Sequence, residues 1–354
     1  MNVLEAARVL GLSAASFLLA LTLTPAVVKL LRHFHFNKQI RSKEQAPVFY
    51  ELHKGKENTP TMGGIVIWAT VFLLALFLWL MGVFFETASD GGQGFWSYLN
   101  FVDRAQTYLP LAAMFVAAAL GLVDDLMGVF RVGTNGGGLK VSQKIIMYLS
   151  LAIIGGLWFY YRLDWNVLYI PFFGNIDIGW WYVPFFVFII VASAFSANET
   201  DGLDGLLGGV SLFSFGALTV VAFSIGRYDL ATFSGVTIGA LLAFLWFNIY
   251  PARFFMGDTG SMALGITMGM IAMLTNTAIF LPFFAMIPVI ESLSVIVQLT
   301  SKKLRGKKIF ISTPIHHHFE AIGWPETKVT MRFWIISSVF SALGLAFFFI
   351  SRYI

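Results

Sequence analysis

The chain has 354 residues, of which 58% are hydrophobic and 12% charged, against about 45–50% and about 25% in soluble domains. Cysteine is absent, which excludes disulfides and thiolate metal sites. Apolar stretches of about 20 residues, long enough to cross the hydrocarbon core of a bilayer, recur along the whole chain and leave no room for a separate soluble domain. We therefore predict a single integral-membrane domain over residues 1–354, an all-α polytopic bundle.

The apolar windows predict ten transmembrane helices. No basic segment or small-residue cleavage site precedes the first window, so we expect a retained span there and not a signal peptide. The eighth and ninth helices must meet in a very short turn at residues 275–277. The predicted spans are residues 9–31, 61–84, 107–123, 142–161, 179–197, 206–225, 231–249, 261–278, 279–299 and 331–351.

The distribution of Lys and Arg predicts the orientation of these spans. Seventeen lie in the connections that follow odd-numbered spans, and five lie on the other side. The positive-inside rule then places those connections in the cytosol and both termini in the periplasm. It also explains the net charge of +4 without a nucleic-acid partner. On the periplasmic side, alternating apolar residues around Pro171 and Gly174 predict a small hairpin over residues 163–178.

The predicted cytosolic ends carry the polar clusters, and the first is the acidic pair Asp124 and Asp125. Adjacent side chains on a helix point roughly 100° apart, so we expect one acid to serve metal or phosphate chemistry and the other to fix geometry. The alternative is a solvated helix end, which the negative end of the helix dipole disfavours for acids.

The second cluster follows the fifth span and holds Asn198, Asp201 and Asp204. The two acids, at i and i+3, are expected to share one face of a turn. Gly202 and Gly205 between them allow close approach of a ligand. The alternative is that Asp201 caps the next helix.

Asp258 lies beside Gly257 at the start of the eighth span. A helix N-terminus favours anions, and a carboxylate offers a hard oxygen to Mg²⁺. The pattern therefore predicts a magnesium or phosphate site, with a simple helix cap as the alternative. Asn248, which ends the preceding span, adds a polar group nearby.

The last cluster is the run His316, His317 and His318 in the second basic loop. Adjacent imidazoles cannot easily ligate one ion, so we expect contacts with a diphosphate or sugar, against the alternative of a surface run. Lys56 precedes the second span. Contact with a phosphate and the positive-inside rule explain a lysine at this position equally well. Glu291 lies within the apolar ninth span, and without a second acid near mid-membrane a proton path is disfavoured.

Four stretches carry a resemblance to a known family: TPTMGG (59–64), TDGLDGL (200–206), FMGDTGS (255–261) and PIHHHFE (314–320). In this order they resemble the polyprenyl-phosphate hexosamine-1-phosphate transferase superfamily, from about Arg41 to Trp324. The His triplet and TPTMGG are similar to its phospho-N-acetylmuramoyl-pentapeptide-transferase family, and favour it over relatives that use UDP-GlcNAc.

The resemblance implies transfer of phospho-MurNAc-pentapeptide from UDP-MurNAc-pentapeptide to undecaprenyl phosphate, which gives lipid I and UMP in peptidoglycan synthesis. It implies Mg²⁺ as cofactor, a homodimer, and a bacterial inner-membrane enzyme whose cleft faces the cytosol. By this resemblance Asp258 binds magnesium, Asp124 and Asp125 form the catalytic acidic pair, and Asp124 deprotonates or orients the lipid phosphate. The implied substrate-binding residues are Lys56, Thr61, Lys144, Asn198, Asp201, Asn248, His316, His317 and His318. The residues implied to contact the uridine portion are Asp204, Phe255 and Gln298.

Two positions depart from the family pattern. Gly128 stands where a lysine is common, so Lys144 is the better match to the family's lysine and Lys140 the second. Glu199 replaces a leucine beside Asn198. Direct attack by the lipid phosphate is favoured over a covalent enzyme intermediate, which the sequence leaves open. A sister transferase using UDP-GlcNAc and a transporter remain as alternatives, and a transporter would spread its polar residues through the bilayer depth.

Overall fold

A computed structural model describes residues 2–37, 56, 59–85, 94–102, 105–133 and 137–353 of the chain. Most of the basic loop 32–58, including Arg41, lies outside these residues. The long helices are α1 (Val3–His33), α3 (Ile65–Phe85), α5 (Ala105–Val129), α6 (Val141–Arg162), α7 (Tyr182–Thr200), α8 (Leu206–Ser224), α9 (Tyr228–Asn248), α10 (Asp258–Leu274), α12 (Met286–Arg305) and α14 (Glu326–Tyr353). The shorter elements are α4 (Phe95–Leu99), β1 (Val167–Ile170), β2 (Gly174–Asp177), α11 (Leu281–Phe284) and α13 (Ile315–Ala321), with 3₁₀ turns at Gly179–Trp181 and Ala278–Phe280.

The long helices make this a multi-pass membrane protein. Eight described helices are long and apolar enough to span a membrane, and α11 with α12 would make a ninth if counted as one bent span. Nine of the ten predicted spans each coincide with one long helix, and the eighth, α10, has 17 residues. Nearly every residue of α10 is buried, because α5 and α7 pack along it at the centre of the bundle.

The ninth predicted span, expected as one helix over 279–299, is broken. α11 and α12 meet at Ala285 with a bend of 90°. Pro288 has no N–H to donate to the carbonyl of Phe284 four residues earlier, so the helix loses a hydrogen bond there. The hydroxyls of Ser214 and Ser341 donate to that carbonyl instead, at 2.7 and 3.2 Å, so helices α8 and α14 stabilise the break.

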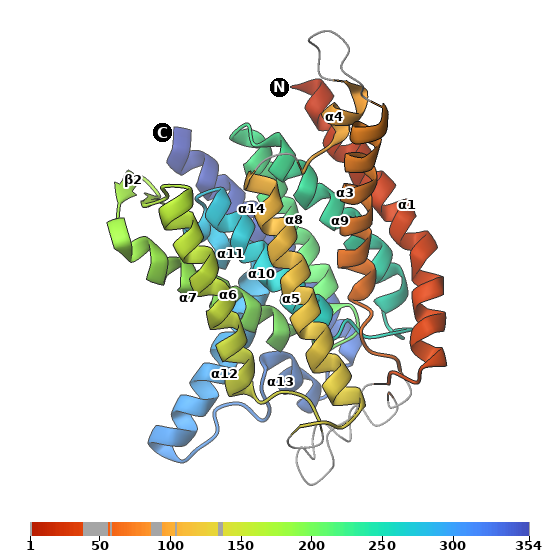
Figure 1. The fold of residues 1–354 in the computed structure, drawn as a ribbon. Coiled ribbons are helices and arrows are strands. Elements are labelled where there is room, and N and C mark those ends of the chain that lie inside the picture. Colours follow the sequence, from red (N-terminus) through yellow and green to blue (C-terminus); the bar gives the residue numbers. More distant parts are fainter. Residues whose placement is uncertain are drawn as a thin grey trace.

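The predicted hairpin is confirmed. β1 and β2 pair in antiparallel register, with Ile170 opposite Gly174. The turn at residues 275–277 also forms, and the side-chain oxygen of Asn276 accepts the N–H of Tyr169 at 3.0 Å. The hairpin and both chain ends lie at one end of the bundle, whereas α13 and the end of α12 lie at the other (Figure 1).

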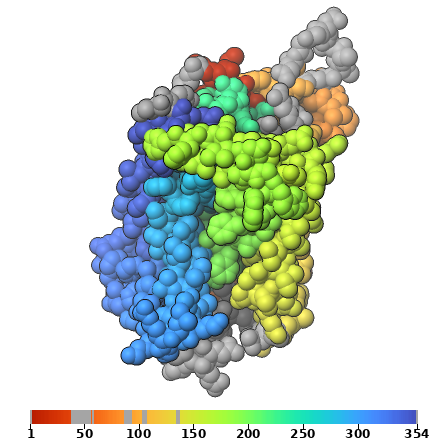
Figure 2. Space-filling model, turned by 90° about the vertical axis from the view of Figure 1, so that its left-hand side faces the viewer, coloured from red at the N-terminus to blue at the C-terminus, as the bar shows by residue number. Residues whose placement is uncertain are grey.

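One side of the bundle is hollowed along its length. In the side view of Figure 2, α7 (green) is recessed between α6 (yellow) and α12 (blue), below the hairpin. An apolar groove of about 260 Å³ lies here, lined by side chains of α7, α10, α11 and α12. It runs close to the end of α7, where Ser196 and Ala197 line it and Asn198 follows.

Candidate active site

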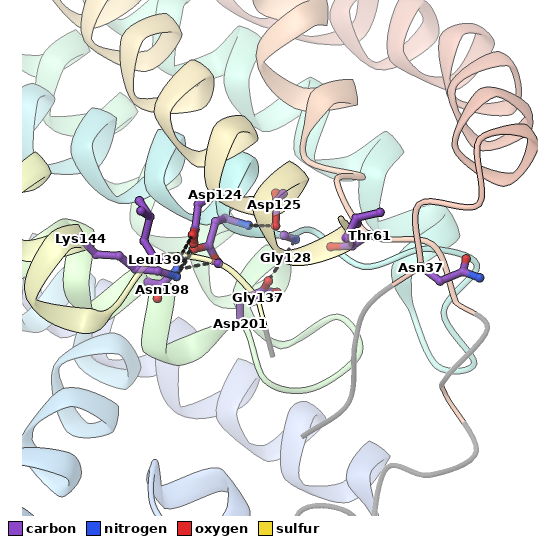
Figure 3. A pocket seen from close by; sticks show the side chains of 14 residues that line it. Asn37, Thr61, Asp124, Asp125, Gly128, Gly137, Leu139, Lys144, Asn198 and Asp201 are labelled. Atoms are coloured by element: carbon purple, nitrogen blue, oxygen red, sulfur yellow. Dashed lines mark hydrogen bonds and ion pairs between the residues drawn. The ribbon is translucent and has the colours of Figure 1, made fainter. Parts of the chain in front are cut away.

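A polar pocket of about 280 Å³ lies at the ends of four helices. Figure 3 shows side chains from α5, α6 and α7 converging on it. It brings together seven of the predicted site residues, which were scattered over 198 positions of the sequence (61–258): Thr61, Asp124, Asp125, Lys144, Asn198, Asp201 and Asp258.

Lys144 joins two acids across the pocket. Its ammonium lies 2.7 Å from a carboxylate oxygen of Asp124 and donates a hydrogen bond to Asp258. The side-chain amide of Asn198 donates to the other Asp258 oxygen at 3.0 Å. Lys144 thus lies in the pocket, while Lys140 is exposed at the start of α6. The pocket therefore holds one positive charge among hard oxygen ligands.

Asp125 faces away from Lys144 and holds the start of α10. Its two carboxylate oxygens accept the backbone N–H groups of Asp258 and Thr259, at 3.1 and 3.0 Å. These N–H groups have no partner inside their own helix. Both acids line the pocket, but they take different partners: Asp124 contacts the Lys144 ammonium, and Asp125 holds the backbone of α10.

The turn before α10 admits only glycine at Gly257. Its φ is +75°, and a Cβ there would lie 2.6 Å from an Asp125 oxygen and 2.9 Å from the Thr61 hydroxyl. The backbone N–H of Gly257 is accepted by Asp201 at 3.2 Å. The turn is thus pressed between α5 and the end of α7, which places Asp258 in the pocket.

The donor set of the pocket fits a hard divalent cation. Among the residues that the structure describes, no three His, Asp or Glu side chains form a ready-made metal cage. Mg²⁺ commonly takes only one or two protein carboxylates and completes its shell with water and substrate phosphates. Asp258 and Asp124, held together by Lys144, offer such a pair.

Asp204 belongs to a second cluster and does not share a face with Asp201, so that expectation is wrong. The ammonium of Lys56 donates to Asp204 at 2.7 Å and to both oxygens of Glu326 at 2.7 and 2.8 Å. The residues between α7 and α8 form a turn with Gly205 at φ +74°, not a helix, so i,i+3 spacing does not align them. The idea that Asp201 caps the next helix is also wrong, because α8 begins at Leu206.

Other predicted contacts support this second cluster. The amide of Asn248 accepts the N–H of Gly205 and donates to the carbonyl of Phe254, at 3.0 and 2.8 Å. The Phe255 ring lies 5.8 Å from the Lys56 ammonium. Burial lowers the pKa of Lys56, but the charges of Glu326 and Asp204 outweigh it and raise that pKa above its usual value.

The histidine run lies on a short helix and not in an exposed loop. His316 is fully buried and pairs with Glu291 of α12 at 3.0 Å, and His317 pairs with Glu320 at 2.8 Å. Burial lowers the pKa of His316, but the charge of Glu291 outweighs it and raises the pKa. A Cβ at Gly202 would lie 2.2 Å from the His316 ring, so this imidazole supports the turn that carries Asp201.

Gln298 and His318, two of the predicted substrate-binding residues, form hydrogen bonds with backbone groups of the segment between α12 and α13. The amide of Gln298 accepts the N–H groups of Ile309 and Phe310 and donates to the Phe310 carbonyl. His318 accepts the N–H of Ile311 at 3.3 Å. Both therefore order the segment that leads from α12 to α13.

Glu326 is the residue that sequence reasoning missed. It accepts the backbone N–H of Asp204 at 2.7 Å in addition to the Lys56 ammonium. In the sequence, Glu326 is only an acid that follows Pro325 in the first turn of a helix. An acid at that position is explained by its favourable interaction with the helix dipole.

Comparison with known proteins agrees with the motifs. A family model for glycosyl transferase family 4 matches residues 107–276, and a phospho-N-acetylmuramoyl-pentapeptide-transferase signature matches residues 56–67. The chain is 38% identical to the phospho-N-acetylmuramoyl-pentapeptide-transferase of Geobacillus thermodenitrificans (strain NG80-2) over 94% of this chain and 95% of that protein. The enzyme of the same name from Anoxybacillus flavithermus (strain DSM 21510 / WK1) is 38% identical over 95% of this chain and 97% of its own length. That from Geobacillus sp. (strain WCH70) is 39% identical over 93% of this chain and 94% of its own length.

Proposed function

Because the chain belongs to the phospho-N-acetylmuramoyl-pentapeptide-transferase family, we propose that the pocket around Asp258 is where it transfers phospho-MurNAc-pentapeptide from UDP-MurNAc-pentapeptide to undecaprenyl phosphate. The products are lipid I and UMP, in peptidoglycan synthesis. The observation that carries the proposal is the Lys144 ammonium held between Asp124 and Asp258.

The charges of this pocket suit a reaction between two phosphates. The donor diphosphate and the acceptor phosphate repel each other, so Lys144 supplies positive charge between them. In direct attack, an acceptor oxygen bonds to the sugar-bearing phosphorus while the bond from that phosphorus to the UMP oxygen breaks. Asp124 orients the acceptor phosphate and takes its proton if it arrives protonated. Trapping of a labelled phospho-MurNAc-enzyme in the absence of lipid would overturn direct attack in favour of a covalent intermediate.

We assign Mg²⁺ to Asp258, with Asp124 as the second carboxylate within reach. When bound, the ion neutralises charge on the donor diphosphate and on the departing UMP. Asn198 keeps one Asp258 oxygen oriented through its hydrogen bond of 3.0 Å, and Asp125 holds the backbone beneath it.

The surroundings of the pocket extend the proposal. The apolar groove beside Ser196 and Ala197 suits the isoprenoid chain of the acceptor, because it leads along α7 to Asn198. The cluster of Lys56, Asp204 and Phe255 is assigned to the uridine end of the donor. The support is the resemblance, with the aromatic ring of Phe255 available for stacking near the Lys56 ammonium.

The proposal includes placement and assembly. The pocket faces the cytosol of the bacterial inner membrane, since the cations in the last turns of α1 and α12 lie at its end of the bundle. We keep the homodimer and the single domain over 1–354 as parts of it, supported by the family resemblance and by one buried apolar cluster shared by the long helices. A monomeric mass of the purified protein in detergent would remove the homodimer.

The test is UMP release by the purified protein with Mg²⁺, undecaprenyl phosphate and either UDP-MurNAc-pentapeptide or UDP-GlcNAc. Release only with the muramoyl substrate, dependent on lipid and Mg²⁺, is expected. Release only with UDP-GlcNAc would move the protein to the sister branch. No release with either donor, from folded protein, would make the transporter alternative the next to test.

Asp258→Ala gives the decisive variant. We expect transfer to fall by on the order of 1,000-fold, while the melting temperature stays close to that of the unchanged protein, because Asp125 bonds to backbone N–H groups that alanine retains. Near-normal UMP release from this variant would remove Asp258 from the metal role.

A further inference from the structure

A second charged pocket lies apart from the candidate active site. It has a volume of about 360 Å³ and lies between the end of α1 and the end of α9, with the turn that follows α9. It shares no lining residue with the pocket around Asp258. Its lining residues are Pro25, Val28, Lys29, Arg32, Phe247 and Arg253.

Three cations converge on this pocket. Lys29 and Arg32 are three residues apart on α1 and therefore project from one face of the helix. The backbone N–H of Arg253 donates to the Phe247 carbonyl at 2.9 Å, and its guanidinium lies 5.6 Å from the Phe247 ring centre. The end of α9 thus turns Arg253 back towards α1.

Among the residues that the structure describes, no carboxylate pairs with the three cations. Within the described ranges, none of them has a carboxylate within the 4.0 Å of an ion pair, and all three are exposed. Positive-inside charge alone predicts cations dispersed in loops, not three from two elements around one hollow. Two guanidinium groups and an ammonium offer the donor geometry that a phosphate prefers.

The walls of the pocket place it at the level of the membrane interface. Pro25, Val28 and Phe247 give it an apolar side. Next to it, α9 exposes Trp246 to 71%, and Tyr250 follows at 51%. Exposed Trp and Tyr at the end of a span mark the boundary between hydrocarbon and water, where lipid phosphates lie.

We propose that this pocket binds the phosphodiester of an anionic membrane phospholipid. Lys29, Arg32 and Arg253 hold the phosphate, and the acyl chains extend along the exposed apolar surfaces of α1 and α9. Basic pockets between spans on the cytosolic side are suited to such headgroups. The turn that carries Arg253 continues to Phe255 and Asp258, so a bound lipid stabilises the segment that leads into the active site.

The test compares lipid binding to two charge-matched variants of the full chain. Lys29→Gln/Arg32→Gln/Arg253→Gln removes the pocket cations. Lys302→Gln/Lys303→Gln/Arg305→Gln removes three exposed cations from the last turn of α12, at the same end of the bundle. Native mass spectrometry and thermal unfolding in detergent are measured with phosphatidylglycerol, phosphatidylcholine, undecaprenyl phosphate or inorganic phosphate.

We expect phosphatidylglycerol to bind and to raise the melting temperature more than phosphatidylcholine. The pocket variant should bind it on the order of 100-fold more weakly, and the α12 variant should remain within about twofold of the unchanged chain. If the pocket variant does not fold, Arg32→Gln and Arg253→Gln are used singly, each with an expected loss of about fivefold.

Four results would overturn the proposal. These are retained binding in the folded pocket variants, an equal loss in the α12 variant, equal protection by inorganic phosphate, and a pocket-dependent preference for undecaprenyl phosphate. Equal protection by inorganic phosphate would indicate a site for free anions. A pocket-dependent preference for undecaprenyl phosphate would indicate a second binding site for the acceptor lipid.

Discussion

Asp124 and Asp125 are neighbours in the chain but bind different partners. Asp124 meets the Lys144 ammonium and accepts the N–H of Leu139, whereas Asp125 accepts two backbone N–H groups of α10. The split follows from the roughly 100° between adjacent helical side chains. In the proposed mechanism, Asp125 therefore acts only through the position of Asp258.

Asp125→Asn separates these two kinds of role. Asparagine keeps the shape but turns an N–H₂ towards a backbone N–H, so one buried donor loses its acceptor. We expect a loss of about 1–3 kcal/mol of stability, seen as a lower melting temperature in detergent. Asp124→Asn is the matched control, in which UMP release falls while α10 keeps its cap. An unchanged melting temperature in Asp125→Asn would refute the capping role.

At the scale of helices, the site depends on how closely α5 approaches α10. A Cβ on Gly121 would lie 2.3 Å from the carbonyl oxygen of Asp258. The absence of that carbon allows the start of α10 to lie against α5, within reach of Asp125. The spacing of two helices therefore sets the position of one carboxylate.

Gly121→Ala tests this contact against a glycine on the same helix. The added methyl must displace the α10 backbone, so we expect a cost of about 1–3 kcal/mol and a loss of UMP release. Gly128→Ala meets nothing within 4 Å, and Gly128 lies in the last turn of α5, so the added methyl displaces no neighbour. Its melting temperature should stay equal or rise. Equal destabilisation of both variants would show that the α5–α10 spacing does not depend on Gly121.

A second element-scale feature is the pairing of α12 with α13 through Glu291 and His316. The bend at Ala285 redirects α12, and Glu291, which the sequence leaves as a lone acid in an apolar span, meets the buried imidazole at 3.0 Å. The pair holds α13 against Gly202 and the turn beside the pocket.

This pair predicts how stability depends on pH. Because the pKa of His316 in the folded chain lies above the ordinary 6.5, its proton stabilises the fold fully below pH 6.5, and that contribution is lost as pH rises through the folded pKa. We expect the melting temperature to fall as pH rises above about 6.5, and His316→Gln to reduce this fall. An identical pH profile in the variant would exclude the pair as its source.

At the scale of the whole molecule, the two ends of the bundle carry different elements. The hairpin and the termini lie at one end, and the pocket, α13 and the last turn of α12 at the other. This division suits an enzyme with a soluble nucleotide substrate better than a transporter, because the polar clusters gather at one surface.

The absence of native cysteine makes the orientation directly measurable. Phe173→Cys, at the hairpin, and Leu304→Cys, at the end of α12, replace residues exposed to 79% and 77%. In intact cells a membrane-impermeant maleimide should label the first and not the second, and both after permeabilisation. Labelling of Leu304→Cys alone in intact cells would reverse the proposed orientation.

The sequence by itself determined nine of the ten predicted helical spans, the hairpin and the grouping of polar residues at helix ends. It could do so because lipid demands long apolar stretches and leaves polar groups only at their ends. The motifs also determined the family, and seven predicted site residues meet in one pocket.

Only the tertiary structure decided which partner each polar side chain takes. Glu326 joins the backbone of Asp204 across 122 residues, and Lys56 completes that cluster. The bend before α12 depends on hydroxyls from α8 and α14. Such pairings depend on which helices pack together, and helix packing follows from the summed contacts of side chains distant in sequence, which no local pattern records.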